Sequence, residues 1–444
     1  MPTHIMADQE IQPARNLSGA VRPPGDKSLS HRCALLGALA EGDSVLENFA
    51  TGADCQSSLA CMAALGAAVE RDPATGKVTV HGVGLHGLRA PAGQLDAGNS
   101  GSTLRMLSGI LAAQPFPTAI GGDASLQRRP MRRILTPLRE MGARIQAADG
   151  DRPPLSFAGT DAPLRAMDYT LPVASAQVKS AILFAGLYAQ GTTVVGEPLT
   201  TRDHSEILLR HMGAPIHRRR GTPARIEIEG PVEKLSPLGD FRIPGDPSSA
   251  AFFLCAAAAF AEGDILVSDV SLNPTRSALL DVLARMGAKA EIVSVADQAG
   301  ELAGTLHLAS HGKKLTGTTI AGEEAVALID EVPILAVLAT ATRDGIDFQD
   351  VGELRVKESD RIATIAANLA AMGARCDVRP DGLFVPGQQR LHGARLPSHH
   401  DHRIAMAFAV AALLAEGPSV IGDAECAAIS FPEFYTNLER LAER

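Results

Sequence analysis

A pattern of roughly 75 residues recurs along the chain and constrains its fold more than any other feature. In each copy a small-residue helix end, often with a Gly, leads into a strand-like run, a loop and a helix that ends in Met/Leu-Gly-Ala. Solenoid repeats hold only about 20–50 residues, so we expect each copy to be a small α/β unit in its own right. The last copy is truncated by the C-terminus, and the Gly of the others is Gly66, Gly142, Gly213, Gly287 and Gly373.

Six copies in 444 residues favour two lobes of three copies each, because a domain usually holds about 100–200 residues. The expected fold class is α/β, with two similar lobes hinged around a central cleft, where ligands prefer to bind. A Pro- and Gly-bearing stretch at 235–244 marks the boundary. We therefore expect the first lobe at 27–240 and the second at 1–26 plus 241–444, with Leu17–Val21 pairing in the second lobe.

Two apolar runs of 12 residues, Ala250–Ala261 and Ile404–Ala415, are shorter than the ~20 residues that span a bilayer, so they predict buried helices. Leu280–Met286 has the apolar spacing of a helix, and Gly287 supplies the left-handed residue that ends it. Residues 1–16 lack the apolar segment of a secretory signal. We expect a cytoplasmic protein that does not enter a membrane.

The composition excludes one class of partner and one class of site. A net charge of −9 provides no global field for a polyanion, and 4% aromatic residues with no Trp provide few surfaces on which bases stack, so nucleic acid is not an expected partner. The six cysteines form no CxxC pair and no Cys/His cluster with zinc spacing. We expect buried, reduced thiols and no metal site.

Loops that combine Gly or Ser with Lys or Arg precede several expected helices. Gly25–Arg32 places basic and hydroxyl groups at a helix start, where free N–H groups favour anions, although Asp26 between Gly and Lys excludes a P-loop. Asn99–Arg105 is a second such loop, and Gln127–Arg133 carries four Arg, which suit bidentate recognition of carboxylate or phosphate. Helix caps and solvated faces remain alternative interpretations of all three.

Charged groups also mark expected helix starts in the second half of the chain. Ile329–Pro333 places two acids before an apolar helix, where a carboxylate acts either as a base or as a cap. Lys357 and Arg361 are i,i+4 neighbours if 355–361 is helical, which predicts a shared anion. Other polar helix starts, each also compatible with an ordinary cap, are Ser175–Lys179, Thr201–His204 and His400–Arg403.

Nine motifs in one order resemble the 5-enolpyruvylshikimate-3-phosphate synthase (3-phosphoshikimate 1-carboxyvinyltransferase) family. They are GDKSLSHR, GNSGSTLR, RRPMRR, SAQVK, TRDH, NPTR, IDE, RVKESDR and DHR. Each motif is modest alone, but together they extend over a sixfold repeat from about Leu17 to Leu438. The resemblance implies two lobes, each of three βαβαββ units, that close over substrates from both sides.

The resemblance implies transfer of the carboxyvinyl group of phosphoenolpyruvate to the 5-hydroxyl of shikimate 3-phosphate, with release of phosphate, by addition and then elimination. This is a step of the shikimate pathway of aromatic amino-acid biosynthesis and the target of glyphosate. No metal and no organic cofactor is implied. Both substrates are multiply anionic and match the separate cationic loops. We expect these two small molecules as partners and a monomeric enzyme.

Site residues follow from the same resemblance, position by position. The shikimate 3-phosphate residues are Lys27, Ser28, Arg32, Ser175, Ala176, Gln177, Arg202, Asp330 and Lys357. The phosphoenolpyruvate residues are Lys27, Gly101, Arg129, Gln177, Lys357, Arg361 and Arg403. Asp330 is the expected base for the 5-hydroxyl, and Lys357 holds that hydroxyl. Glu358 is the expected proton donor to the methylene carbon, while Lys27 assists departure of phosphate.

Two alternative functions remain. The sister family, UDP-N-acetylglucosamine enolpyruvyl transferase, shares the fold, but it has Lys-Asn where this chain has Lys27 and Ser28, and it uses a catalytic Cys in a mobile loop. No Cys of this chain stands in such a Gly/Arg-rich loop. A non-catalytic anion-binding protein of the same fold is the other alternative. The paired acids Asp330 and Glu358 argue against it, because binding alone needs no such pair.

The sequence departs from the family pattern near its end. Some members carry a Lys just before the final Ser/Thr-Phe-Pro, whereas Ile429 stands there in this chain, so the site has one fewer cation. The SAQVK and NPTR motifs resemble a subgroup that tolerates glyphosate. Gly101 instead predicts sensitivity, since a Cβ there would meet the longer inhibitor before the substrate. We favour this steric interpretation.

Overall fold

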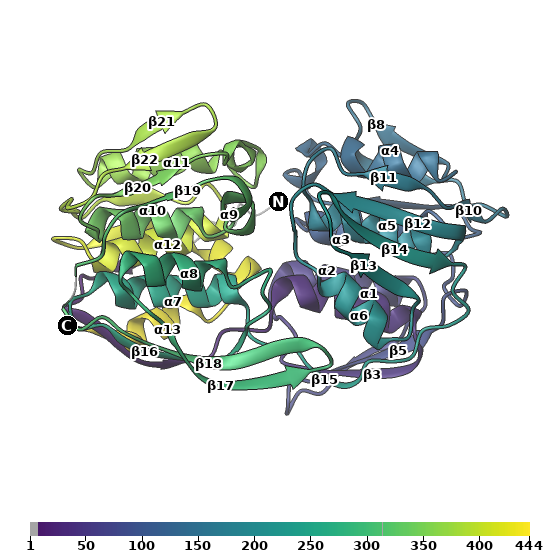
Figure 1. Cartoon of the computed structure of the whole chain (residues 1–444), viewed down its shortest axis with the longest axis horizontal. Helices are drawn as coiled ribbons and strands as arrows, with labels where there is room; N and C mark the ends of the chain where they lie inside the picture. The colour runs from purple at the N-terminus through teal and green to yellow at the C-terminus, as the bar shows by residue number, and fades with distance from the viewer. Residues whose placement is uncertain (1–7, 313) are drawn as a thin grey trace. The chain divides into compact units, whose positions relative to one another are not determined.

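The computed structural model describes residues 8–312 and 314–444, which divide into two lobes (Figure 1). The first lobe is Gly25–Ile243 with Asp297–Glu301, and the remaining described residues form the second lobe. Each lobe has a hydrophobic core of its own. The chain changes lobe at Pro24–Gly25 and Ile243–Pro244, whereas the sequence places these boundaries at 26–27 and 240–241.

The described residues of the first lobe contain three mixed sheets. One has the order β15 (Gly239–Arg242), β3 (Glu41–Glu47), β5 (Val78–Val83), β4 (Val69–Arg71). The next has the order β6 (Leu95–Asp96), β7 (Thr118–Gly121), β9 (Arg152–Phe157), β8 (Ile145–Ala148). The third has the order β10 (Leu164–Arg165), β12 (Ala189–Glu197), β14 (Ala224–Gly230), β13 (Ile216–Arg219), with β11 (Asp168–Thr170) also on β12.

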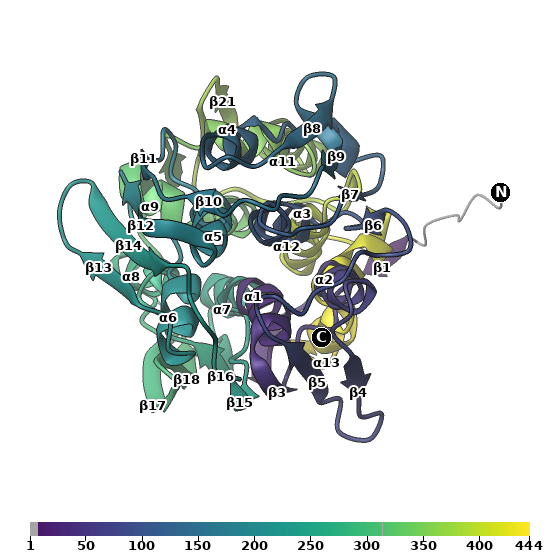
Figure 2. The ribbon, with the colours of Figure 1, turned by 90° about the vertical axis from the view of Figure 1, so that its right-hand side faces the viewer.

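Three nearly fully buried helices occupy the centre of this lobe, and Figure 2 shows the sheets around them. These helices are α1 (Lys27–Leu39), α3 (Gly101–Leu111) and α5 (Ala176–Gly186), with α3 packed against both α1 and α5. Their apolar side chains form the core. The more exposed helical elements are α2 (Ala53–Ala64), α4 (Arg132–Glu140), α6 (His204–His211) and the 3₁₀ turn η1 (Leu126–Arg128).

The described residues of the second lobe also contain three sheets. The largest has the order β17 (Glu291–Gln298), β18 (Glu301–Ala309), β16 (Asp264–Ser271), β2 (Asn16–Val21), β25 (Ala442–Glu443). Another has the order β19 (Thr318–Ile320), β20 (Ile346–Phe348), β22 (Gly382–Val385), β21 (Asp377–Arg379). The smallest has the order β1 (Gln9–Ile11), β24 (Ser419–Gly422), β23 (Arg395–Pro397).

Again three helices are buried at the centre, and two of them are the apolar runs identified in the sequence. They are α7 (Pro247–Ala259), α10 (Val332–Ala341) and α12 (His402–Leu413), which pack on one another. The other helical elements are α8 (Ala278–Met286), α9 (Gly322–Ala327), α11 (Arg361–Ala371), α13 (Phe434–Leu441) and the 3₁₀ turns η2 (Gly352–Val356) and η3 (Ala424–Ile429). Within the described ranges no helix has the length and apolarity to cross a membrane.

The expected repeat is confirmed, because each lobe contains three α/β copies in its described residues. The order β6-α3-β7-α4-β8-β9 is one βαβαββ unit, and β19 to β22 follow the same order with α9 added. The helix ends are also as expected. Gly287 follows α8 with a φ of 105°, a left-handed conformation that favours Gly at the end of a helix.

A paired strand stands next to each position where the chain passes from one lobe to the other. In the second lobe β2 pairs in parallel with β16, as expected for Leu17–Val21, and in the first lobe β15 pairs in parallel with β3. Gly25 stands at the first passage, where an added Cβ would lie 1.8 Å from the carbonyl oxygen of Asn48. Only Gly therefore allows this approach of the two backbones.

A further passage between the lobes, which no sequence feature indicated, occurs at the β17–β18 hairpin. Its turn, Asp297–Glu301, belongs to the first lobe, although the rest of both strands belongs to the second. In the first lobe Glu301 Oε1 lies 2.7 Å from His204 Nδ1, and both side chains are fully buried. A buried carboxylate requires a hydrogen-bonding partner, so this pair anchors the turn to the start of α6.

Candidate functional site

Five helices that carry expected site residues in their first turn begin with a capping Asp or Ser. Each cap accepts a hydrogen bond from a backbone N–H of its own helix and leaves other first-turn N–H groups for an anion. The pairs are Asp26 with Leu29 at 2.8 Å, Ser100 with Thr103 at 3.1 Å, Ser175 with Val178 at 3.4 Å, Asp360 with Ala363 at 3.0 Å and Asp401 with Arg403 at 3.0 Å. The cap and the anion interpretations are thus compatible.

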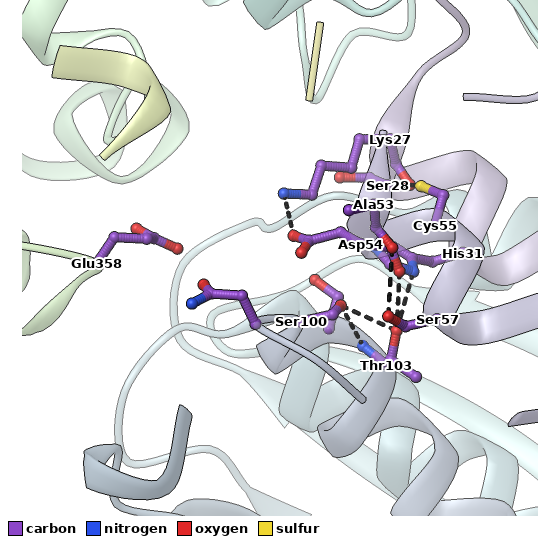
Figure 3. Close-up of polar contacts among 12 residues, drawn as sticks. Lys27, Ser28, His31, Ala53, Asp54, Cys55, Ser57, Ser100, Thr103 and Glu358 are labelled. Atoms are coloured by element: carbon purple, nitrogen blue, oxygen red, sulfur yellow. Dashed lines mark hydrogen bonds and ion pairs between the residues drawn. The ribbon is translucent and has the colours of Figure 1, made fainter. Parts of the chain in front are cut away.

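Lys27 is the first residue of α1, and its ammonium forms an ion pair with the carboxylate of Asp54 in the first turn of α2 (Figure 3). The Lys27 side chain is 20% exposed and that of Asp54 is 9% exposed. Asp54 was not identified from the sequence, where an acid in the first turn of a helix is commonplace. The pair places one positive and one negative group at adjoining helix starts.

Arg32 is buried and joins three helices of the first lobe. Its Nε donates to Ser205 Oγ of α6 at 2.7 Å, Nη2 to Ser180 Oγ of α5 at 3.0 Å, and Nη1 to the Ser28 carbonyl of α1 at 2.7 Å. Burial, together with the charge of Arg202, lowers the pKa of Arg32 to about 10, while Glu206 and Glu301 oppose the shift. The guanidinium therefore remains charged at neutral pH and provides a fixed positive charge.

Other expected residues of the first lobe lie near Arg32 or at the start of α5. Arg202 Nη1 donates to Ser28 Oγ at 2.8 Å, which brings Ser28, Arg32 and Arg202 together. Ser175 and Ala176 begin α5. Gln177 links α5 to α3, since its Nε2 donates to Ser102 Oγ at 2.8 Å and its Oε1 accepts from Arg105 Nη1 at 2.7 Å.

Gly101 is the first residue of α3, and two guanidinium groups lie close to it. An added Cβ would lie 2.7 Å from Arg105 Nη1 and 3.5 Å from Arg129 Nη1. Arg129 is held in turn by Asn99, whose Oδ1 accepts from Arg129 Nη2 at 2.9 Å. A side chain at position 101 therefore meets a protein cation before any ligand, a contact that the sequence did not indicate.

In the second lobe the guanidinium of Arg361 gathers three carboxylates. It donates to Asp401 from Nε at 2.8 Å and Nη2 at 3.3 Å, to Glu358 from Nη2 at 2.7 Å, and to Asp330 from Nη1 at 3.4 Å. The Arg361 side chain is 1% exposed. Burial alone would lower its pKa, but Asp401, Glu358 and Asp330 together raise the pKa above its usual value. The group is a permanent cation.

The expected base and a further cation meet at the start of α10 and α12. Arg403 Nη1 donates to the Asp330 carbonyl at 3.1 Å, and Nη2 lies 3.5 Å from Asp330 Oδ2. Glu331 stands at the N-cap position of α10, and its side chain accepts a hydrogen bond from Ser248 of α7, so it joins two helices while Asp330 faces the guanidinium groups. Asp330, Glu358, Arg361 and Arg403 are thus brought together as expected.

The interpretation of Lys357 and Arg361 as i,i+4 neighbours on one helix is wrong. Lys357 ends η2 in an extended conformation, and α11 begins at Arg361 because Asp360 caps it. The Lys357 ammonium lies 3.5 Å from Glu353 and is 24% exposed, whereas Arg361 is buried. Non-helical residues therefore separate the two cations, and the two side chains do not share a helix face.

Lys179 of the SAQVK motif is an internal ion-pair residue. Its fully buried ammonium lies 2.9 Å from Glu197 and 2.7 Å from Glu206. Arg218 joins the same carboxylates at 3.2 and 3.5 Å. These four residues hold α5, α6, β12 and β13 together, so only the first residues of SAQVK are left to contact a ligand.

The cysteines are free, and five of the six are buried, while Cys376 is partly exposed. Burial raises the pKa of Cys61 and Cys426 to about 12 and that of Cys376 to about 11. A nucleophilic Cys needs the opposite shift, so these thiols are not activated. In the described ranges no group of three or more His, Cys, Asp or Glu is placed to hold a metal ion.

Comparison with known proteins identifies the family. Residues 11–438 match the model of EPSP synthase (3-phosphoshikimate 1-carboxyvinyltransferase). Proteins of that name from Solibacter usitatus and Koribacter versatilis are 53% and 54% identical over 439 residues, with 98% and 99% of this chain and the whole of each relative covered. An EPSP synthase structure from Acinetobacter baumannii has a TM-score of 0.86 at 40% identity and 98% coverage of both chains. The chain belongs to the EPSP synthase (3-phosphoshikimate 1-carboxyvinyltransferase) family.

Proposed function

We propose that the chain transfers the carboxyvinyl group of phosphoenolpyruvate to the 5-hydroxyl of shikimate 3-phosphate and releases phosphate. One observation carries this proposal beyond family membership. The carboxylates of Asp330 and Glu358 share the buried guanidinium of Arg361, so a base and an acid are held near each other and beside a fixed cation. A protein that only binds anions needs no such pair, whereas addition followed by elimination needs both.

Shikimate 3-phosphate is assigned to the cationic group at the starts of α1, α5 and α6, with two residues of the second lobe. Arg32 and Arg202 carry the charge for its phosphate, and Ser28 accepts a hydrogen bond from each, through its carbonyl from Arg32 and through its hydroxyl from Arg202. Gln177 supplies an amide at the same end of α5. The full set is Lys27, Ser28, Arg32, Ser175, Ala176, Gln177, Arg202, Asp330 and Lys357.

Phosphoenolpyruvate is assigned to cations from both lobes. In the first lobe Arg129 lies beside the start of α3, where its Nη1 is 3.5 Å from the position of a Cβ added to Gly101. In the second lobe Arg361 and Arg403 meet at Asp330. The full set is Lys27, Gly101, Arg129, Gln177, Lys357, Arg361 and Arg403.

The roles in the reaction follow from which bonds change. Asp330 takes the proton of the 5-hydroxyl while the hydroxyl oxygen forms a bond to C2 of phosphoenolpyruvate. Lys357 holds that hydroxyl in place. Glu358 delivers a proton to C3, which becomes a methyl group. Elimination then returns a proton from this methyl group to the Glu358 carboxylate and breaks the C–O bond to phosphate, whose negative charge Lys27 stabilises. Electrons and atoms balance without a redox step.

The proposal includes no metal, no organic cofactor and no macromolecular partner, and it places a monomeric enzyme in the cytoplasm. Phosphate release by the purified chain tests it, with phosphoenolpyruvate and either shikimate 3-phosphate or UDP-N-acetylglucosamine as acceptor. The proposal is supported if phosphate is released from phosphoenolpyruvate with shikimate 3-phosphate as acceptor, but not with the nucleotide sugar, and if EDTA does not change this release. Release only with the nucleotide sugar would assign the sister reaction, and release with neither would leave a binding protein.

A further inference from the structure

Hydrogen-bonded hydroxyl groups and the ring of His31, together called the hydroxyl chain, lie near the starts of α1, α2 and α3, and Figure 3 labels His31, Ser100 and Thr103 among them. His31 Nδ1 is 2.8 Å from Ser58 Oγ, which is 2.8 Å from Thr103 Oγ1. Thr103 Oγ1 donates to Ser100 Oγ at 2.9 Å and approaches the Asp54 carbonyl at 3.3 Å. His31, Ser58, Ser100 and Thr103 are all fully buried. None of the four is among the residues assigned to the substrates.

The imidazole of His31 is neutral, and its hydrogen bonds fix the direction of this chain. Burial lowers its pKa well below the ordinary value, and the cations Lys27 and Arg32 lower it further, against Asp26. Among the described residues Nε2 has no hydrogen-bond partner. A buried N–H without a partner is rarer than a bare acceptor, so Nδ1 carries the proton and donates to Ser58. Ser58 then donates to Thr103, and Thr103 to Ser100.

Each member of the hydroxyl chain lies on, or caps, a helix whose first turn carries Lys27, Asp54 or Gly101. His31 is one turn after Lys27 on α1, and Ser58 is one turn after Asp54 on α2. Ser100 caps α3, directly before Gly101, and Thr103 lies in the first turn of that helix. The hydrogen bonds therefore fix the spacing and rotation of three helix starts with respect to one another.

We propose that His31 is a positioning residue, which acts through Ser58, Thr103 and Ser100 to hold Lys27, Asp54 and the Gly101 helix start in the arrangement that binds phosphoenolpyruvate. This inference rests on the proposed function and deepens it. It concerns phosphoenolpyruvate in particular, because Lys27 is the only one of the positioned residues that is also assigned to shikimate 3-phosphate, and the two guanidinium groups assigned to that phosphate have other ties. Arg32 is held by Ser180 and Ser205, and Arg202 is bonded to Ser28.

Three substitutions at position 31 separate the polar atom from the shape of the ring. Asn places an amide near Nδ1, Gln places one near Nε2, and Leu has no polar atom. We expect His31→Leu and His31→Gln to raise the KM for phosphoenolpyruvate about tenfold and to lower kcat, since small misplacements of reacting groups have large effects. His31→Asn should restore both to within about threefold of the unmodified enzyme, because its amide replaces Nδ1–H as a donor.

The dissociation constant of shikimate 3-phosphate, measured calorimetrically without phosphoenolpyruvate, should stay within about twofold in all three variants. Thr103→Val removes the hydroxyl of the residue that lies between Ser58 and Ser100 in the hydroxyl chain, and Thr103→Ser keeps this hydroxyl. The test therefore does not depend on the folding of a single variant. Ser108→Ala is the matched control. Ser108 is a buried hydroxyl of the same helix, but it bonds only to the Leu104 carbonyl of its own helix.

An unchanged KM for phosphoenolpyruvate in His31→Leu and Thr103→Val would overturn the inference. So would an equal loss of shikimate 3-phosphate affinity, or a Ser108→Ala variant with the same kinetic defect, because each indicates a general loss of structure. Failure of the proposed function looks different, since then the unmodified chain releases no phosphate from the two substrates.

Discussion

Arg361 and Asp401 form the innermost ion pair of the candidate site, with Nε donating to Oδ2 at 2.8 Å and both side chains almost completely buried. Asp401 also caps α12 by accepting from the Arg403 N–H. One carboxylate therefore orients two guanidinium groups, Arg361 through its side chain and Arg403 through the helix that begins there. Neither role was assigned to Asp401 from the sequence, although the DHR motif contains it.

Asp401→Asn separates these two functions, because Asn remains a good cap but has no charge. Removing one partner of a buried ion pair typically lowers stability by about 3–5 kcal/mol. Arg361 keeps Glu358 and Asp330, so we expect a smaller loss of about 1–3 kcal/mol in the free energy of unfolding, measured in urea. Asp344→Asn, which breaks an exposed pair with Arg343, should leave stability nearly unchanged. Equal effects of the two substitutions would contradict this account.

Asp330→Asn tests the proposed base. The amide preserves the shape of the side chain but cannot take a proton, so kcat should fall by about 10²–10⁴-fold while the affinity for shikimate 3-phosphate changes little. The neighbouring Glu331→Gln is the control, because the Glu331 carboxylate accepts a hydrogen bond from Ser248 of α7 and thereby joins α10 to α7. It should reduce stability more than kcat. Parallel losses of turnover and affinity in Asp330→Asn would make Asp330 a binding residue.

The sequence was most informative where one residue type has one structural explanation. The Gly of each Met/Leu-Gly-Ala element marked a helix end, and five successive copies of it revealed the repeat before any strand was assigned. Gly287 illustrates why, since its φ of 105° is available to few other residues. Apolar runs such as Ala250–Ala261 were similarly unambiguous, because a helix buried on all sides has no polar face.

The sequence was least informative about contacts between residues far apart in the chain. Nothing near Glu301 or His204 indicates that a hairpin turn is shared between lobes, and nothing near Asp54 indicates that Lys27 is its partner. Residues 355–361 do not form one helix, and the reason is local. Asp360 competes for the backbone as an N-cap, so the helix starts at Arg361, four residues after Lys357.

His31 predicts a pH dependence of stability. Its pKa is lowered in the folded state, mainly by burial and also by Lys27 and Arg32, while an unfolded His titrates near about 6.5. Below that pH the unfolded chain binds a proton that the folded chain does not. The contribution of His31 to the unfolding free energy should therefore fall as pH falls from about 7 to about 5, by up to about 1.4 kcal/mol per pH unit.

The comparison with His31→Asn isolates this term, because the other histidines are common to both proteins. The difference in unfolding free energy between the unmodified chain and the variant should become less favourable to the unmodified chain as pH falls. His399→Asn is the control, since this side chain is exposed and Asn readily adopts its left-handed backbone. A difference for His31 that is constant between about pH 7 and pH 5 would show that its ring protonates equally in both states.

The last prediction concerns Gly101, where the structure changes the expected effect of a methyl group. A Cβ there would lie 2.7 Å from Arg105 Nη1, the same atom that donates to Gln177 Oε1. Gly101→Ala should therefore move Arg105 and raise the KM for phosphoenolpyruvate, in addition to any steric effect on glyphosate. If both effects operate, the inhibition constant rises more than KM, with the excess at most the ~1–3 kcal/mol that one methyl group discriminates.

A double-mutant cycle with Arg105→Met separates the two effects. Met keeps an unbranched side chain without a charge, so in this background Gly101→Ala no longer displaces a guanidinium. The KM increase caused by Gly101→Ala should then shrink, while the increase in the glyphosate inhibition constant persists. If the KM increase is the same in both backgrounds, Arg105 does not transmit it. If the inhibition constant and KM always rise together, the steric explanation of glyphosate sensitivity at Gly101 is wrong.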